Sequence, residues 1–133
     1  QTQTDDINTA LVTGANAVVV NLVESGAIGT AETLMNAIKE KDVPAVFFNR
    51  AVSTDNAEAA ELFKGYEKSA FIGTDFTQAG IMQGKMVGQY GSTTDELDLN
   101  KDGKISYVMF KGDEANQEAI ARTKYAWSAL TKC

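Results

Sequence analysis

The stretch Pro44-Ala-Val-Phe-Phe-Asn-Arg50 decides the fold. It begins with proline, continues through four apolar residues and ends in polar ones. A short apolar run bounded in this way is typical of a strand that is buried on both faces. The stretch Ala17-Val-Val-Val-Asn-Leu-Val23 has the same character, and runs of strand length recur at residues 69–73 and 104–110. Strands that are apolar on both faces are typical of parallel sheets, which helices cover.

Segments with the apolar spacing of helices separate these strands. They fall at residues 7–11, 30–41, 56–65, 74–90 and 116–130. We expect Asp5 or Asp6 to cap the first helix and Gly91 to end the fourth. Helices that alternate with strands require right-handed crossovers, so the sequence predicts an α/β fold, a doubly wound parallel sheet with helices on both faces. The aromatic side chains expected in its core are Phe47, Phe48, Phe71, Tyr125 and Trp127.

The sequence opens on a helix, whereas a doubly wound sheet normally begins with its central strand. We therefore expect an N-terminal truncation, and residues 1–133 to form part of one α/β lobe that another segment or chain completes. A sheet without its first strand would expose an edge that something must cover.

Composition excludes several functions. The chain has 18 acidic and 12 basic residues and a net charge of −6, which argues against binding to nucleic acid or to an anionic membrane. It contains no histidine, so it cannot build a Ser-His-Asp triad or a histidine-ligated zinc site. Its single cysteine, Cys133, excludes an internal disulfide. No phosphate-binding glycine loop is present, and an α/β enzyme is the least favoured class.

The most specific motif is Asp98-Leu-Asn-Lys-Asp-Gly-Lys-Ile-Ser106, which matches the first half of a calcium-loop template. Calcium takes six to eight oxygen ligands, and alternate residues of a curled loop supply them. The expected ligands are the side chains of Asp98, Asn100 and Asp102, the carbonyl of Lys104, and Ser106. The second half departs from the template, because Met109 replaces its glutamate and a strand follows. The alternative interpretation is an acidic surface turn.

Polar residues also follow the predicted strands, where open α/β sheets bind ligands. Asn49 and Arg50 close the strand that begins at Pro44, and Asn116, Glu118 and Arg122 follow the last strand. Amide, carboxylate and guanidinium groups match the donors and acceptors of sugar hydroxyls. The alternatives are a simple turn residue at Asn49 and a surface ion pair between Glu118 and Arg122, which are one helical turn apart.

Several segments together carry a family resemblance: 21–23, 43–50, 72–75, 98–105 and 121–125 appear in this order. With them the chain resembles the bacterial galactose/glucose-binding proteins, the extracytoplasmic solute receptors of sugar ABC importers. The resemblance covers nearly the whole chain, and the calcium loop before a parallel strand is its most specific part. The framework of strands and helices alone would also fit ribose receptors and the effector domains of sugar-responsive repressors.

The resemblance implies a type I periplasmic-binding-protein lobe, one of two around a hinged cleft that closes on a monosaccharide. It implies a structural Ca²⁺ on the loop of residues 98–106, with a further glutamate ligand beyond residue 133. It places sugar-binding residues at Asn49 and Arg122. Asn116 and Glu118 stand where the family has histidine and aspartate, which puts the preference among sugars in doubt.

The resemblance also implies that the protein binds its ligand and catalyses no reaction. The expected partners are a monosaccharide, an ABC permease and a chemoreceptor, with no nucleic acid, and the expected location is the periplasm or, as a lipoprotein, the outer cell surface. The second lobe and the first strand lie outside this chain. The alternative function is the effector-binding domain of a sugar-responsive transcription regulator, against which the calcium loop argues because free calcium is low in the cytosol.

Overall fold

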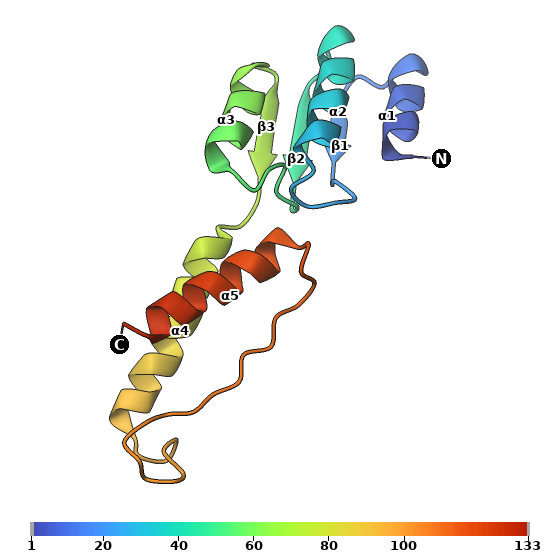
Figure 1. Ribbon diagram of the computed structural model, residues 1–133. Helices are drawn as coiled ribbons and strands as arrows, with labels where there is room; N and C mark the ends of the chain where they lie inside the picture. The colour runs from blue at the N-terminus through green and yellow to red at the C-terminus, as the bar shows by residue number, and fades with distance from the viewer. Residues whose placement is uncertain (1, 133) are drawn as a thin grey trace. The chain divides into compact units, whose positions relative to one another are not determined.

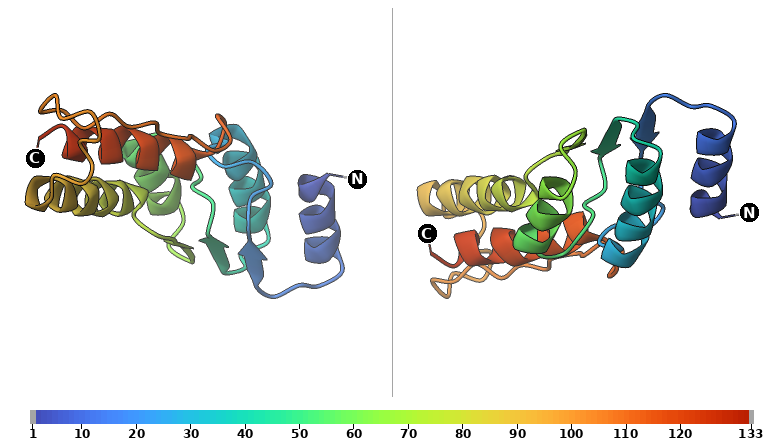
Figure 2. Two further views of the ribbon diagram at one scale, coloured as in Figure 1. Left: turned by 90° about the horizontal axis from the view of Figure 1, so that it is seen from below. Right: turned by 90° about the horizontal axis from the view of Figure 1, so that it is seen from above.

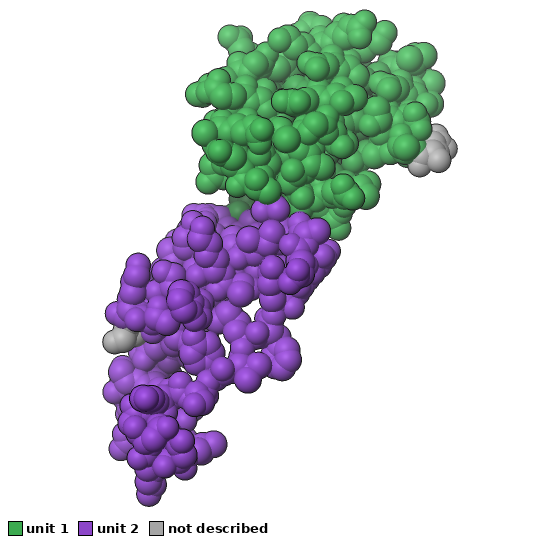
Figure 3. All heavy atoms as spheres, viewed as in Figure 1, with its two compact units in different colours: residues 1–74 green, residues 75–133 purple. Residues whose placement is uncertain are grey.

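The computed structural model describes residues 2–132, so Cys133 lies outside the described residues. The chain forms two compact units, Gln1–Thr74 and Asp75–Cys133 (Figure 3). They are called unit 1 and unit 2. Among the described residues, no helix has the length and apolar character needed to cross a membrane.

Unit 1 contains a three-stranded parallel sheet in the order β1-β2-β3 (Figure 1). The strands are β1 (Val18–Val20), β2 (Ala45–Phe48) and β3 (Ser69–Ile72), and the helices are α1 (Gln3–Val12), α2 (Ile28–Glu40) and α3 (Asn56–Lys64). Val20 pairs with Phe47, and Phe47 with Phe71. The predicted α/β class with parallel strands is confirmed.

The helices of unit 1 cover one face of this sheet (Figure 2). Two successive crossovers in the same direction along the sheet put α2 and α3 on the same side, and α1 packs against α2. The strands show the same asymmetry, because Val18 and Val20 are buried while Val19 is 70% exposed. The largest fully buried side chains are Phe47, Leu22, Leu34, Ile38, Val20 and Val52. The expected helices on the second face are not part of unit 1.

This asymmetry corrects the predicted core. Phe47 is buried as expected, whereas Phe48 is exposed because it points to the uncovered face. Phe71 is only partly covered, since β3 lies at the edge of the sheet. In unit 2, Tyr125 is partly buried and Trp127 is exposed.

Helix α1 begins differently from the prediction. Its N-cap is Thr2, whose hydroxyl accepts a hydrogen bond from the backbone N–H of Asp5 at 3.3 Å. Asp5 accepts in return from the backbone N–H of Thr2 at 2.9 Å and from its hydroxyl at 2.8 Å, which completes a capping box. The bonds that Asp5 accepts lower the pKa of its carboxyl group, and the bond from the Thr2 backbone N–H contributes most to this shift. Asp5 therefore stabilises the cap, and neither Asp5 nor Asp6 is the cap itself.

Unit 2 is built on two helices, α4 (Phe76–Thr93) and α5 (Gln117–Leu130), that pack against each other (Figure 1). The close approach requires Gly80 and Gly84 on α4, both of which are buried. Helix α4 runs through Gly91 rather than ending there, since a glycine inside a helix costs only about 1 kcal/mol.

The prediction of a strand at residues 104–110 is wrong. The segment is irregular and exposed, with Val108 at 78% and Phe110 at 92%. A strand exists only when a neighbouring strand accepts and donates its backbone hydrogen bonds. The described part of unit 2 contains helices and irregular segments only, so an apolar run of strand length has no partner there.

Candidate functional site

The first candidate site lies at the carboxyl ends of β1 and β2 in unit 1. Asn49 directly follows β2, and Asn21 directly follows β1. Asn49 has a left-handed backbone with φ +65°, and its N–H donates to the carbonyl of Ile72 at 3.0 Å. Its side-chain Nδ2 donates to Oδ1 of Asn21 at 3.4 Å. Asn21 and Asn49 are both exposed, so this hydrogen bond lies at the surface of the protein.

Two further side chains hold the segment that contains Asn21. Gln3 of α1 donates through Nε2 to the Asn21 carbonyl at 2.7 Å and accepts through Oε1 from the Val23 N–H at 3.2 Å. Arg50 donates through Nη1 to the carbonyl of Leu22 at 3.1 Å and to that of Val23. The predicted residues Asn49 and Arg50 therefore belong to a polar cluster that also contains Gln3 and Asn21.

Sequence reasoning missed Asn21 and Gln3. A signal for Asn21 was present, because it is a polar residue inside the apolar run 17–23. Gln3 carries no local signal, since it reaches the cluster from another element.

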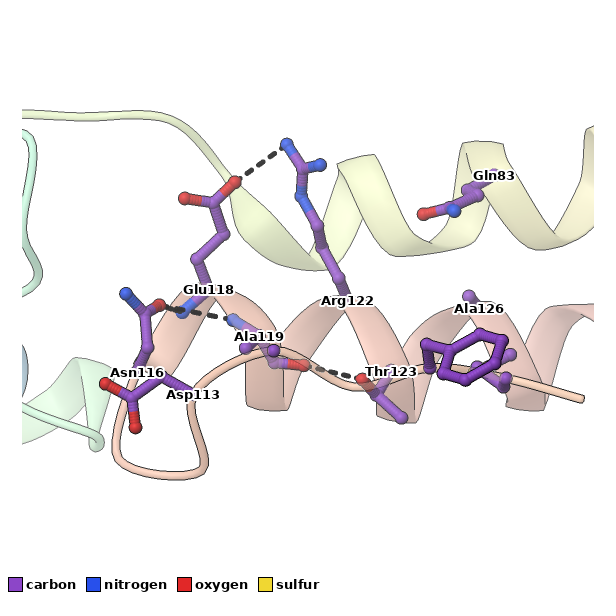
Figure 4. A pocket seen from close by; sticks show the side chains of 11 residues that line it. Gln83, Asp113, Asn116, Glu118, Ala119, Arg122, Thr123 and Ala126 are labelled. Carbon is purple, nitrogen blue, oxygen red and sulfur yellow. Dashed lines mark hydrogen bonds and ion pairs between the residues drawn. The ribbon is translucent and has the colours of Figure 1, made fainter.

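The second candidate site is an open pocket of about 430 Å³ in unit 2 (Figure 4). It falls within the range of ligand-binding pockets. The three residues predicted after the last strand, Asn116, Glu118 and Arg122, all line it. Asp113 and Gln83 line it too and were not predicted. Gln83 comes from α4, so only the packing of the two helices reveals its place.

Asn116 is the N-cap of α5, which fixes its side chain. Its Oδ1 accepts from the backbone N–H groups of Glu118 at 2.8 Å and Ala119 at 3.2 Å. The carbonyl end of the amide is thus engaged by the helix, and the structure describes no partner for the Nδ2 group. Asn116 therefore presents a donor at the pocket.

Glu118 and Arg122 form the ion pair that their spacing predicts, with 2.8 Å between Glu118 Oε1 and Arg122 Nη2 (Figure 4). Both side chains are about half exposed, at 42% and 51%, so the pair itself contributes little to folding. The carboxylate retains acceptor capacity and the guanidinium retains donors, since each group has more positions than one contact uses. The arrangement thus places donors and acceptors side by side on one helix face.

The predicted calcium loop curls around the side chain of Asp98. Its Oδ1 and Oδ2 accept from the backbone N–H groups of Asp102 at 3.2 Å and Gly103 at 2.8 Å. Asn100 Nδ2 donates to Asp102 Oδ2 at 3.0 Å, so two of the three side chains expected to bind calcium are in contact, while the third, Asp98, holds the backbone of the loop. Gly103 has φ +76°, which allows the sharp turn. Lys104 follows, with its N–H donating to Asp102 Oδ1 at 2.9 Å, and Ser106 is exposed.

The donor set of this loop fits a hard cation, because every predicted ligand atom is an oxygen. It contains two carboxylates, and across residues 2–132 no three His, Cys, Asp or Glu side chains gather in a group able to hold a metal. The remaining charge and coordination would have to come from a ligand outside the loop.

Comparison with known proteins agrees with the family resemblance of the sequence. The periplasmic binding protein domain family matches residues 1–133. The D-galactose/methyl-galactoside binding periplasmic protein MglB of Haemophilus influenzae is 35% identical over 128 residues. That match includes 96% of this chain and 36% of the relative, so the chain spans about a third of the length of the protein it resembles.

Proposed function

Because the chain belongs to the periplasmic binding protein family, we propose that it is part of an extracytoplasmic hexose receptor that delivers its sugar to an ABC permease. The similarity to a galactoside-binding relative supports a hexose as the ligand. The observation that carries the proposal is the pocket of unit 2, where Asn116, Glu118 and Arg122 offer complementary hydrogen-bonding groups.

The ligand is held by hydrogen bonds to its hydroxyl groups. A hydroxyl both donates and accepts, so it pairs with the Asn116 amide N–H, the Glu118 carboxylate and the Arg122 guanidinium alike. Bonds to the two charged groups are the stronger ones. In unit 1, Asn49 supplies a side-chain amide at a strand end, the position where open α/β sheets bind ligands.

The receptor binds sugar without changing it. Differential affinity of the sugar for an open and a closed state would drive closure of the cleft, which the permease and a chemoreceptor then recognise. We propose a periplasmic location, with a lipoprotein anchor as the variant for a cell without a periplasm. The periplasmic relative gives no support to the alternative, a cytosolic regulator domain.

We also propose that the loop of residues 98–106 binds Ca²⁺ as a structural ion. Asp98, Asn100 and Asp102 would supply side-chain oxygens, Lys104 its carbonyl and Ser106 its hydroxyl. The contact between the Asn100 and Asp102 side chains, and the curl of the loop backbone around Asp98, support this assignment. A bound ion would stabilise the folded loop, because it binds the native state and not the unfolded chain.

Isothermal titration calorimetry of the intact protein with D-galactose and D-glucose tests the proposed function. We expect saturable heat from at least one of these hexoses and none from a pentitol or an amino acid. Conversion of the sugar, detected by chromatography after long incubation, would contradict a pure binding role. The absence of heat and of any change in Trp127 fluorescence with both hexoses would overturn the proposal.

A further inference from the structure

We infer that Asn21 is a positioning residue that determines which end of the Asn49 side-chain amide faces a bound sugar. This inference rests on the proposed hexose-binding function and extends it to a residue that makes no sugar contact of its own. The observation behind it is the hydrogen bond from Asn49 Nδ2 to Asn21 Oδ1, 3.4 Å long, between two residues 28 positions apart in the chain.

The two side chains meet because of the strand register. β1 and β2 are parallel, and Val20, the last residue of β1, pairs with Phe47, so β2 ends one residue beyond β1 at the same edge of the sheet. Asn21 follows Val20 immediately, and Asn49 comes two residues after Phe47. The left-handed backbone at Asn49 turns the chain at this point, and its N–H is bonded to Ile72 of β3.

Asn21 is itself held in place. Gln3 donates a hydrogen bond to the Asn21 carbonyl and accepts one from the Val23 N–H. Arg50, the neighbour of Asn49, donates to the carbonyls of Leu22 and Val23. The segment 21–23 is therefore tied to α1 and to the end of β2, so the backbone that carries the Asn21 acceptor is held beside Asn49.

A fixed acceptor orients the neighbouring amide. A side-chain amide carries two N–H donors at one end and a carbonyl oxygen at the other. When Nδ2 of Asn49 donates to Asn21, Oδ1 of Asn49 is directed away from it, and the structure describes no partner for that oxygen. The Asn49 oxygen is thus offered as an acceptor, which selects a sugar hydroxyl that donates. Without Asn21 the amide is free to rotate, and part of its preorganisation for that hydroxyl is lost.

The test is a double-mutant cycle on the intact protein, with D-galactose and D-glucose as probes in calorimetry. Asn21→Ala removes the acceptor, and we expect hexose affinity to fall roughly 3- to 10-fold, the scale of one hydrogen bond. Asn21→Asp keeps an acceptor and should bind like the unmodified protein. Asn49→Gly removes the amide while tolerating the positive φ, and in that background Asn21→Ala should have no further effect. Asn36→Ala, at an exposed asparagine of α2, is the matched control.

The cycle separates positioning from general stability. An Asn21→Ala affinity equal to that of the unmodified protein would overturn the inference, and so would an equal loss with and without Asn49. A loss in Asn21→Asp as large as that in Asn21→Ala would also contradict it, because the acceptor is retained. These outcomes leave hexose binding by the unmodified protein intact. Failure of the unmodified protein to bind either hexose overturns the proposed function and the inference together.

Discussion

Gly84 of α4 lies directly against the backbone of Ala126 on α5, so closely that a Cβ atom at Gly84 would overlap the Ala126 carbonyl oxygen. The same virtual atom would lie 2.8 Å from Cβ of Ala129 and 3.0 Å from the Ala126 carbonyl carbon. The two helices therefore touch through their main chains at this point. Their spacing sets the distance between Gln83 and the α5 side chains in the pocket of unit 2.

Gly84→Ala should therefore destabilise the protein, although alanine is the better helix former. We expect a loss of about 1–3 kcal/mol of unfolding free energy, the usual cost of overpacking a close contact. Urea denaturation followed by circular dichroism measures it. Gly29→Ala is the control, because a Cβ there meets no atom within 4 Å and the residue lies within α2. The control should be neutral or slightly stabilising, and equal losses in both variants would contradict the close contact.

Arg122→Ala should weaken hexose binding by about 2 kcal/mol, the scale of a hydrogen bond to a charged group, which is roughly 30-fold in Kd. The protein should fold normally, because the ion pair that Arg122 forms with Glu118 is half exposed. Calorimetric titration with D-galactose measures the effect. Lys124→Ala is the matched control, since it removes a cation on the same helix that lies 5.4 Å from the Tyr125 ring centroid. An Arg122→Ala protein with unchanged Kd would remove Arg122 from the sugar site.

Asp102→Ala should reduce calcium affinity and abolish the stabilisation that calcium gives. For the unmodified protein we expect a higher melting temperature in millimolar calcium than in chelator, because binding to the native state adds RT ln(1 + [L]/Kd). The variant should melt at the same temperature in both conditions. Asp95→Ala, outside the loop, should keep the difference. An unmodified protein that melts alike with calcium and with chelator would argue for an acidic turn without a metal.

Thr2→Val should raise the pKa of Asp5 part of the way to its ordinary value. The backbone N–H of Thr2, which contributes most to the lowered pKa, remains in the variant, while the hydroxyl bond is lost. The folded state holds the Asp5 proton less tightly than the unfolded state does. The contribution of Asp5 to stability is thus complete above the unfolded pKa of about 4 and is lost as the pH falls through the lowered folded value.

Carboxyl carbon NMR shifts of Asp5 between pH 2 and 6 measure this change. Thr30→Val, at an exposed threonine of α2, should leave the Asp5 titration as it is. An unchanged Asp5 pKa in Thr2→Val would show that the hydroxyl takes no part in the capping box.

The sequence predicted features that depend on neighbours along the chain. The Glu118–Arg122 pair was predictable because two residues four apart on a helix share a face. The strand at residues 104–110 was not, because an apolar run becomes a strand only beside a partner. The bond between Asn21 and Asn49 depends on the register of two strands, and the place of Gln83 in the pocket depends on helix packing. Neither relationship is encoded in spacing along the chain.

The left-handed backbone at Asn49 restricts which side chains this position can accept. Asparagine, aspartate and glycine adopt that conformation readily, and β-branched side chains are strained in it. A library randomised at position 49 should consequently yield few well-folded alternatives. Substitutions should be easier to accommodate at Asn21, Asn116, Glu118 and Arg122, none of which has a positive φ.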